Sequence, residues 1–268
     1  MTNENSSPGW GLRLWAVLVG LVLVAPTLIV VPLSFAGRAS FAFPPKGWSL
    51  RWYQNIWQSP EWRDALLTSF QVGLLVTVVA TLVGTAAAVG LHRRGGRLSA
   101  VLTGLLLAPM VVPGIVAAVA IYGVFLRWRL TGNLLGFVLA HCVLAIPFVL
   151  VAVSASLRGS DPVLLRAAAS MGAGPLRAFW RVTLPSILPG VASGALFAFT
   201  TSFDEVVAAS FLQSPRIRTL PVEMFVSVTN QVDPTIAAVS TVVLTITTLV
   251  VLLPMLVRTR SSERQALR

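Results

Sequence analysis

The chain has 268 residues, of which 56% are hydrophobic and only 11% are charged. A soluble domain of this size carries about 25% charged residues, so the composition indicates a protein of the lipid bilayer. The net charge of +11 does not indicate nucleic acid binding, because the basic residues lie in short runs between apolar segments and not on one basic face. Runs of this kind are typical of the cytoplasmic loops of membrane proteins.

Six apolar segments are long enough to cross a bilayer, which takes about 20 residues. They are Leu12–Leu33, Leu66–Leu91, Leu98–Phe125, Leu134–Leu157, Ser186–Phe211 and Ile236–Val257. The expected fold class is therefore an all-α membrane protein with six transmembrane helices, in a single domain over residues 1–268. With the N-terminus inside, the inner segments hold twelve of the basic residues and the outer segments eight. This bias predicts that both termini lie on the inner side.

The first span has an alternative interpretation as a signal peptide, because Ser34-Phe35-Ala36 resembles a cleavage site. The apolar run is long for such a peptide, and the N-terminal region holds only one basic residue, Arg13. Removal of this span would also leave five spans and disturb the even topology. We therefore expect a retained span.

The outer segment, residues 34–65, is rich in aromatic side chains. It holds Trp48, Trp52, Tyr53, Trp57 and Trp62. Tryptophan is enriched at the membrane–water interface, and the helical spacing predicts a short amphipathic helix lying on the outer surface. The alternative is a docking surface for a soluble binding protein.

The chain has few side chains that could act as nucleophiles or metal ligands. Lys46 is the only lysine and lies in no phosphate-binding loop, and Cys142 is the only cysteine. His92 and His141 are far apart in the sequence, and a lone histidine in an apolar run is more often packed or hydrogen-bonded than a ligand. The sequence therefore predicts no catalytic residues, no metal site and no cofactor.

Small residues and prolines recur within the spans. Gly190 and Gly194 form a small-x-x-x-small pair, which lets two helices approach closely in lipid. Pro109, Pro113 and Pro147 interrupt helices, which is tolerated where the helix lines a cavity or packs on neighbours. Together these residues favour a tightly packed, moving bundle over an inert anchor.

The loop 158–185 predicts two helices joined at a glycine. Asp161 and Pro162 begin the first helix, which Gly172 ends. Gly174-Pro175 begins the second, which runs toward Leu184-Pro185. The tip of this elbow is small and apolar, which suits insertion into a groove of another protein. The alternative is an ordinary amphipathic helix resting on the membrane.

The spacing in this loop resembles the EAA loop of ABC-importer permeases, which reads E-A-A, three residues, Gly, nine residues, an apolar residue, any residue, Leu-Pro. The resemblance implies a coupling loop that docks onto a separate ATPase. The coupling residues it marks are Arg166, Ala167, Ala168, Met171, Gly172, Leu184 and Pro185. Arg166 stands where the family has Glu, so an ion pair made by that Glu would be inverted or missing here.

Two carboxylates, Asp204 and Glu205, lie within the predicted fifth span. A charge at mid-depth costs at least about 2.5 kcal/mol, so such residues face a cavity or a partner. Adjacent helical positions point about 100° apart, and both cannot line one stripe. Asp204 is the favoured cavity-facing residue. The alternative is that both carboxylates lie near the water-exposed outer end of the span or pair with Arg on a neighbouring subunit.

Three segments resemble the permeases of spermidine/putrescine importers. They are Thr200–Val207, Phe41–Tyr53 and Arg218-Thr219-Leu220-Pro221. The resemblance implies a type I ABC importer permease in the bacterial inner membrane, with a second permease, two ATPase subunits and an extracytoplasmic binding protein as partners.

The same resemblance implies a substrate pathway through Ser202, Phe203, Asp204 and Glu205. Carboxylates and aromatic faces suit a polyamine, through charge pairing and cation–π contacts. The alternative substrates are an opine, aminoethylphosphonate or ferric iron. A rival class is a gradient-driven carrier that acts alone.

Overall fold

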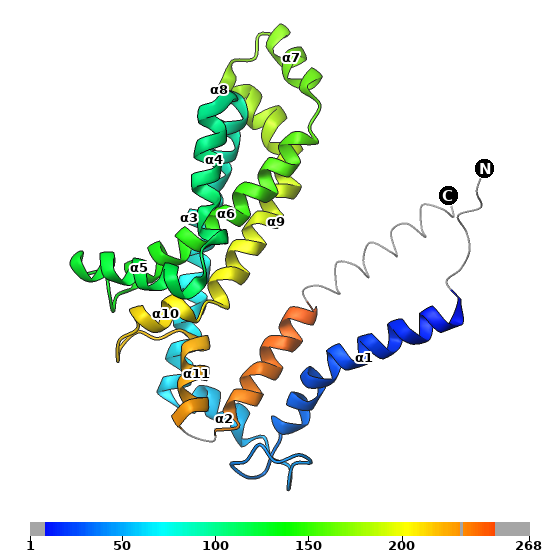
Figure 1. Ribbon diagram of the computed structural model, residues 1–268, viewed down its shortest axis with the longest axis vertical. Helices are drawn as coiled ribbons and strands as arrows, with labels where there is room; N and C mark the ends of the chain where they lie inside the picture. Colours follow the sequence, from blue (N-terminus) through cyan, green and yellow to red (C-terminus); the bar gives the residue numbers. More distant parts are fainter. Residues whose placement is uncertain (1–8, 231–232, 250–268) are drawn as a thin grey trace. The chain divides into compact units, whose positions relative to one another are not determined.

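The computed structural model describes residues 9–230 and 233–249. This part of the chain is helical and contains no β-strand, only two isolated bridges, Ala36 with Trp48 and Ser214 with Ile217. Its contacts divide it into two compact units (Figure 1). Among the described residues, one unit takes in 9–60, 226–230 and 233–249, and the other is Glu61–Phe225.

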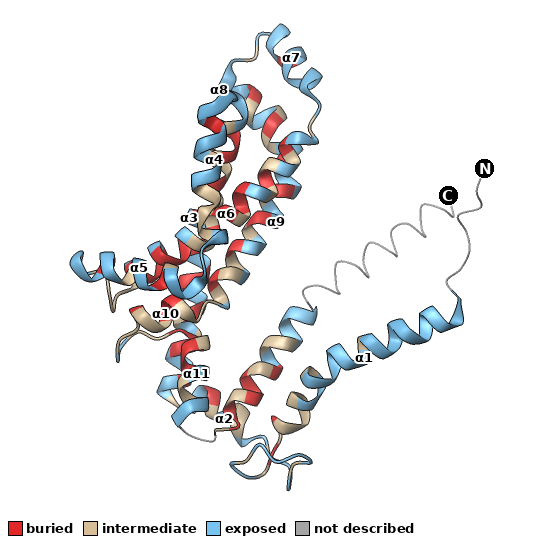
Figure 2. Ribbon diagram, in the orientation of Figure 1, coloured by how far each residue is buried: buried red, intermediate tan, exposed pale blue. Residues whose placement is uncertain are grey.

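In the first unit, α1 (Trp10–Leu33) is apolar all round and has no buried residue (Figure 2). A helix with this composition needs an apolar environment on every side, as the predicted first span requires. A shorter apolar helix covers Thr235–Leu249. The predicted sixth span, Ile236–Val257, begins in this helix, and its end lies outside the described residues.

The predicted short helix of the outer segment is α2 (Arg51–Gln58), also in the first unit. Trp52 Nε1 donates a hydrogen bond to the Ala36 carbonyl at 2.6 Å, and the hydroxyls of Tyr53 and Ser34 lie 2.6 Å apart. Trp48 and Trp57 remain exposed. The Trp52 and Tyr53 side chains thus anchor the preceding loop, the Trp48 and Trp57 side chains are open to an interface, and Trp62 is buried.

The second unit contains the long helices. In chain order they are α3 (Pro60–Arg94), α4 (Gly96–Val111), α5 (Gly114–Arg127), α6 (Leu134–Arg158), α7 (Pro162–Ser170), α8 (Pro175–Ala178), a π-helical turn (Phe179–Thr183), α9 (Leu184–Phe203), α10 (Val207–Leu212) and α11 (Leu220–Asn230), whose last residues belong to the first unit. The predicted second and fourth spans are confirmed as the apolar helices α3 and α6.

Glycine allows α6 and α9 to pack closely. A Cβ on Gly190 would collide with Ser156 Oγ, and one on Gly194 would lie 3.1 Å from Val149 Cα. The predicted small-x-x-x-small pair is therefore confirmed as a close helix contact. Ile187 and Ala198, also on α9, are fully buried.

Two predicted spans are wrong as continuous helices. The third, Leu98–Phe125, is bent by 106° between α4 and α5. The bend lies at Val112, whose ψ of 129° is extended. The residue after it is Pro113, and proline disfavours the helical conformation in the residue that precedes it. The described residues thus contain four helices long and apolar enough to span a membrane, or five if the bent pair is one span.

The fifth predicted span, Ser186–Phe211, corresponds to an apolar helical run long enough to span a membrane, but its predicted end is wrong. An unbroken helical run extends over Pro175–Phe203 and then ends, and α10 begins after a break at residues 204–206. Asp204 and Glu205 therefore lie in a break between helices and not inside a span.

Candidate functional site

The elbow, residues 161–185, has the predicted local structure. Asp161 Oδ1 accepts a hydrogen bond from the Val163 amide at 2.8 Å, and Pro162 occupies the first turn of α7. Gly172 follows α7 with a φ of +79°, a left-handed conformation that glycine adopts without strain. The elbow lies at one end of the second unit and α10 lies toward the other (Figure 1).

The predicted coupling residues do not all share one surface. Arg166, Ala167, Met171 and Gly172 are exposed, whereas Ala168 is buried. Ala168 lines a cavity of about 220 Å³ beneath the elbow.

Leu184 and Pro185 lie at the start of α9, within the unbroken run Pro175–Phe203, so the second helix of the elbow continues into the long helix. Leu184 is half-buried and Pro185 is exposed. Pro185 is tolerated there because it occupies the first turn of α9, after a π-helical turn.

Sequence reasoning missed the larger apolar side chains of the elbow. Leu176 is 72% exposed and Trp180 is 60% exposed, beside the 82% exposed Met171 in the same segment. Exposed apolar side chains of this size mark a surface that contacts another protein or the membrane. The signal that could have revealed them is the position of Trp180 in an Arg-bearing loop, away from the cluster of outer tryptophans.

At the other end of the helical run, the two carboxylates have different environments. Asp204 is exposed and ends α9, where its amide donates to the Thr200 carbonyl at 3.0 Å. Glu205 is partly buried, and its Oε1 accepts a hydrogen bond from the Ala208 amide at 2.6 Å. Glu205 therefore caps α10, and Asp204 is the carboxylate left open to a ligand.

Glu205 lies outside the apolar helix run, and its surroundings act on its acidity in opposite directions. Burial raises the pKa of Glu205, the amides of Ala208 and Val207 lower it, and the neighbouring Asp204 raises it. The net result is a pKa above the usual value for Glu.

Ser202 and Phe203, the other predicted pathway residues, are held by other helices. Ser202 is buried, and its Oγ lies 2.9 Å from His141 Nδ1 of α6. The prediction that His141 is packed or hydrogen-bonded is thus confirmed.

The Phe203 ring contacts two further aromatic rings. Its centroid lies 5.3 Å from that of Phe70 on α3 and 5.5 Å from that of Phe199 on α9. Sequence reasoning missed Phe70 and Phe199, because only the packing of α3 against α9 brings the three rings together. The pathway residues therefore sit beside an aromatic cluster, which can contact a cation through its ring faces.

Among the described residues, no group of three or more His, Cys, Asp or Glu side chains is placed to hold a metal ion. At the break, the exposed carboxylate of Asp204 can attract a ligand, whereas Ser202 and Glu205 are hydrogen-bonded within the fold. Ser202 Oγ lies beside a base, His141 Nδ1, but both side chains are buried, so a ligand at the break meets the Asp204 carboxylate and not this pair.

The chain belongs to the family described as "Binding-protein-dependent transport system inner membrane component", which it matches over residues 80–264. It is therefore a multi-pass inner-membrane permease component of an ABC importer and not an enzyme. In such systems, a separate ATPase, a second permease and a substrate-binding protein complete the machine.

Three relatives resemble the chain over most of its length. The putrescine transport system permease protein PotI of Escherichia coli strain K12 is 34% identical, over 87% of this chain and 85% of the relative. The spermidine/putrescine permease PotC of Haemophilus influenzae is 31% identical, over 90% and 93%. The molybdenum transport system permease ModB of Mycobacterium bovis is 31% identical, over 88% and 89%.

The fold resembles a solved structure of a bacterial ABC transporter involved in the import of the acidic polysaccharide alginate. The TM-score is 0.68 with 15% sequence identity, over 96% of this chain and 99% of that one. At this identity the likeness concerns the fold alone.

Proposed function

We propose that this chain is the permease subunit of an ATP-driven importer for polyamines such as putrescine and spermidine. The observation that carries the proposal is the likeness to PotI and PotC over nearly the whole chain. The chemistry of the break supports it, because an exposed carboxylate beside aromatic rings suits a flexible organic cation.

In this proposal residues 1–268 form one permease domain with six spans and both termini inside. The chain pairs with a second, different permease, two ATPase subunits and an extracytoplasmic binding protein. The segment 34–65 lies on the outer face, and the coupling loop 158–185 lies on the inner face.

The elbow is the proposed ATPase contact. The exposed Arg166, Ala167, Met171 and Gly172 touch the ATPase, and the buried Ala168 lets α7 sit close to the following helix. Leu184 and Pro185 act within the helical run that carries movement away from the elbow. The neighbouring Trp180 enlarges the apolar contact.

At the other end of that run, Asp204 attracts the substrate cation and Phe203 offers it a ring face. Ser202, tied to His141, fixes the end of α9. Glu205 shapes the pathway indirectly, because its carboxylate holds the start of α10.

A second candidate is the same machine with another small substrate. The likeness to ModB favours a molybdenum species, and an opine, aminoethylphosphonate or ferric iron would use the same architecture. An exposed Asp204 suits a cation better than an anion, since like charges repel.

The test is transport in vesicles that contain this chain, its partner permease, the ATPase and the binding protein, supplied with radiolabelled putrescine or spermidine. Uptake that needs ATP and every component supports the proposal. Uptake by this chain alone, driven by an ion gradient, would instead establish a carrier. ATP hydrolysis stimulated by the binding protein without polyamine uptake would keep the machine and reject the substrate.

A further inference from the structure

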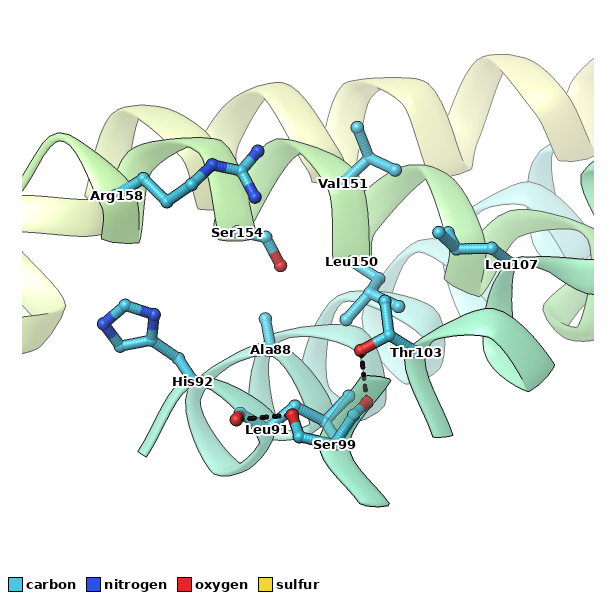
Figure 3. A pocket seen from close by; sticks show the side chains of 10 residues that line it. All are labelled: Ala88, Leu91, His92, Ser99, Thr103, Leu107, Leu150, Val151, Ser154 and Arg158. Atoms are coloured by element: carbon cyan, nitrogen blue, oxygen red, sulfur yellow. Dashed lines mark hydrogen bonds between the residues drawn. The ribbon is translucent and has the colours of Figure 1, made fainter. Parts of the chain in front are cut away.

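A pocket of about 320 Å³ lies between the ends of α3, α4 and α6, outside the elbow and the break (Figure 3). Arg158 and Ser154 of α6 face His92 and Ala88 of α3 across it. The wall farther from these polar groups is apolar and includes Leu107, Leu150 and Val151. The pocket is thus polar at one end and apolar at the other.

The hydrogen bonds within the pocket decide which groups are free to donate to a ligand. Ser99 Oγ donates to the Leu91 carbonyl at 2.7 Å, and Thr103 Oγ1 donates to the Ser99 carbonyl at 2.8 Å. Each hydroxyl carries a single proton, so neither is left to bind an anion. The side chains of His92, Ser154 and Arg158 have no hydrogen-bond or ion-pair partner among the described residues.

The charge around the pocket has one sign. Arg93, Arg94 and Arg97, in the same α3–α4 connection, are exposed. No acidic residue occurs in the sequence between Asp64 and Asp161. The α4 helix begins at Gly96 without a side-chain cap, and the positive end of its dipole adds to the field. These features favour a negatively charged ligand.

The surface beside the pocket distinguishes a lipid from a small soluble anion. Val151 of α6 lines the pocket and is 45% exposed, and Leu107 of α4 is partly exposed, so the apolar wall of the pocket presents an open surface. A free phosphate would contact the polar end and leave this surface bare. A phospholipid would place its headgroup among the cations and its acyl chains along the apolar side chains, as basic pockets between membrane helices allow.

We propose that this pocket binds a phosphate-headed anionic phospholipid, with Arg158, His92 and Ser154 as the headgroup ligands. Arg158 also ends α6, three residues before the Asp161 that caps α7. A lipid at this position therefore braces the helix end from which the elbow starts. The proposal rests on the pocket alone and holds for any transported substrate.

The test uses the purified, delipidated full-length chain in mild detergent and measures its thermal unfolding during titration with phosphatidylglycerol. Phosphatidylglycerol should raise the unfolding temperature, whereas phosphatidylcholine, which has no net charge, should not. Arg158→Gln should weaken the apparent affinity about fivefold, the effect of one basic residue near an anionic lipid surface. Arg127→Gln, which removes an exposed arginine at the end of α5, is the matched control and should bind as the unaltered chain does.

Three results would overturn the proposal. One is an equal temperature shift with phosphatidylcholine, and another is an equal shift with inorganic phosphate, which would identify a phosphate site without a lipid. The third is unchanged phosphatidylglycerol binding by Arg158→Gln. If that variant fails to fold, two others test the same proposal. We expect weaker phosphatidylglycerol binding by His92→Gln and near-normal binding by Arg158→Lys.

Discussion

The two ends of the helical run Pro175–Phe203 are built by different means. The elbow at its start follows from neighbouring residues, with Asp161 and Pro162 beginning α7 and Gly172 ending it. The break at its end depends on residues far away in the sequence, through the Ser202–His141 contact and the edge-on contact of the Phe203 and Phe70 rings. Between the ends, α9 is packed on α6 through Gly190 and Gly194.

This difference shows how one helical run can join the proposed ATPase contact to the proposed substrate pathway. The start and end of α7 are set by contacts between neighbouring residues, so the proposed ATPase contact there does not depend on residues far away in the sequence. The break holds its carboxylates only while α3, α6 and α9 stay packed together. A movement imposed at the elbow is expected to reach Asp204 as a displacement of the whole run.

The largest expected effect comes from removal of the elbow tip. Deletion of residues 167–172 should abolish ATP-dependent uptake and separate this chain from the ATPase, because the exposed contact surface is lost. Co-purification of the tagged complex measures the contact, and membrane insertion of the variant is the control. An ATPase that still co-purifies would contradict the coupling role.

The link between the ends is tested by a pair of glycine variants. Gly190→Ala should destabilise the protein by about 1–3 kcal/mol, because the added methyl group collides with Ser156 and approaches the Ala152 carbonyl at 2.8 Å. Gly104→Ala on α4 meets no atom within 4 Å and should stabilise by up to about 1 kcal/mol. Thermal unfolding compares the two, and shifts of the same sign would refute the close packing of α6 and α9.

At the break, Asp204→Asn should reduce polyamine uptake without affecting assembly. The expected loss at low substrate concentration is about fivefold or more, since a unit charge pair at 4 Å contributes about 1 kcal/mol even in water. Initial uptake rates across a range of polyamine concentrations measure the effect. Unchanged rates at every concentration would remove Asp204 from the pathway.

The smallest effect is expected for the second carboxylate. Glu205→Ala removes the acceptor of the Ala208 amide and should cost about 0.5–2 kcal/mol of stability, as for other helix caps. Thermal unfolding of Glu205→Ala and Asp204→Asn tests the division of roles. A larger stability loss in Asp204→Asn than in Glu205→Ala would reverse the assignment.

The sequence was sufficient where structure depends on short-range chemistry. Long apolar runs predicted α1, α3 and α6, and the residues Asp161, Gly172 and Gly174 predicted the elbow. Prediction from the sequence failed at two places where a predicted span is not one continuous helix. The bend at Pro113 was foreseen as a kink but not as a turn of 106°, since hydropathy is the same for a straight and a bent helix.

The other failure concerns the carboxylates. Apolar residues on both sides of Asp204 and Glu205 predicted a single span, whereas the two acidic groups coincide with the helix break. The helix breaks here because the Glu205 carboxylate accepts a hydrogen bond from the Ala208 amide and so stabilises the start of α10. The contacts of Phe70 with Phe199 and Phe203 were beyond prediction, since they depend on the register between α3 and α9.

The most direct test of the account is uptake of radiolabelled putrescine by vesicles containing the complete transporter, with ATP and without it. We predict uptake that requires ATP and the binding protein, and that falls in Asp204→Asn. Uptake of molybdate but not of putrescine by the same vesicles would contradict the proposed substrate. Uptake of putrescine without the ATPase would contradict the proposed mechanism.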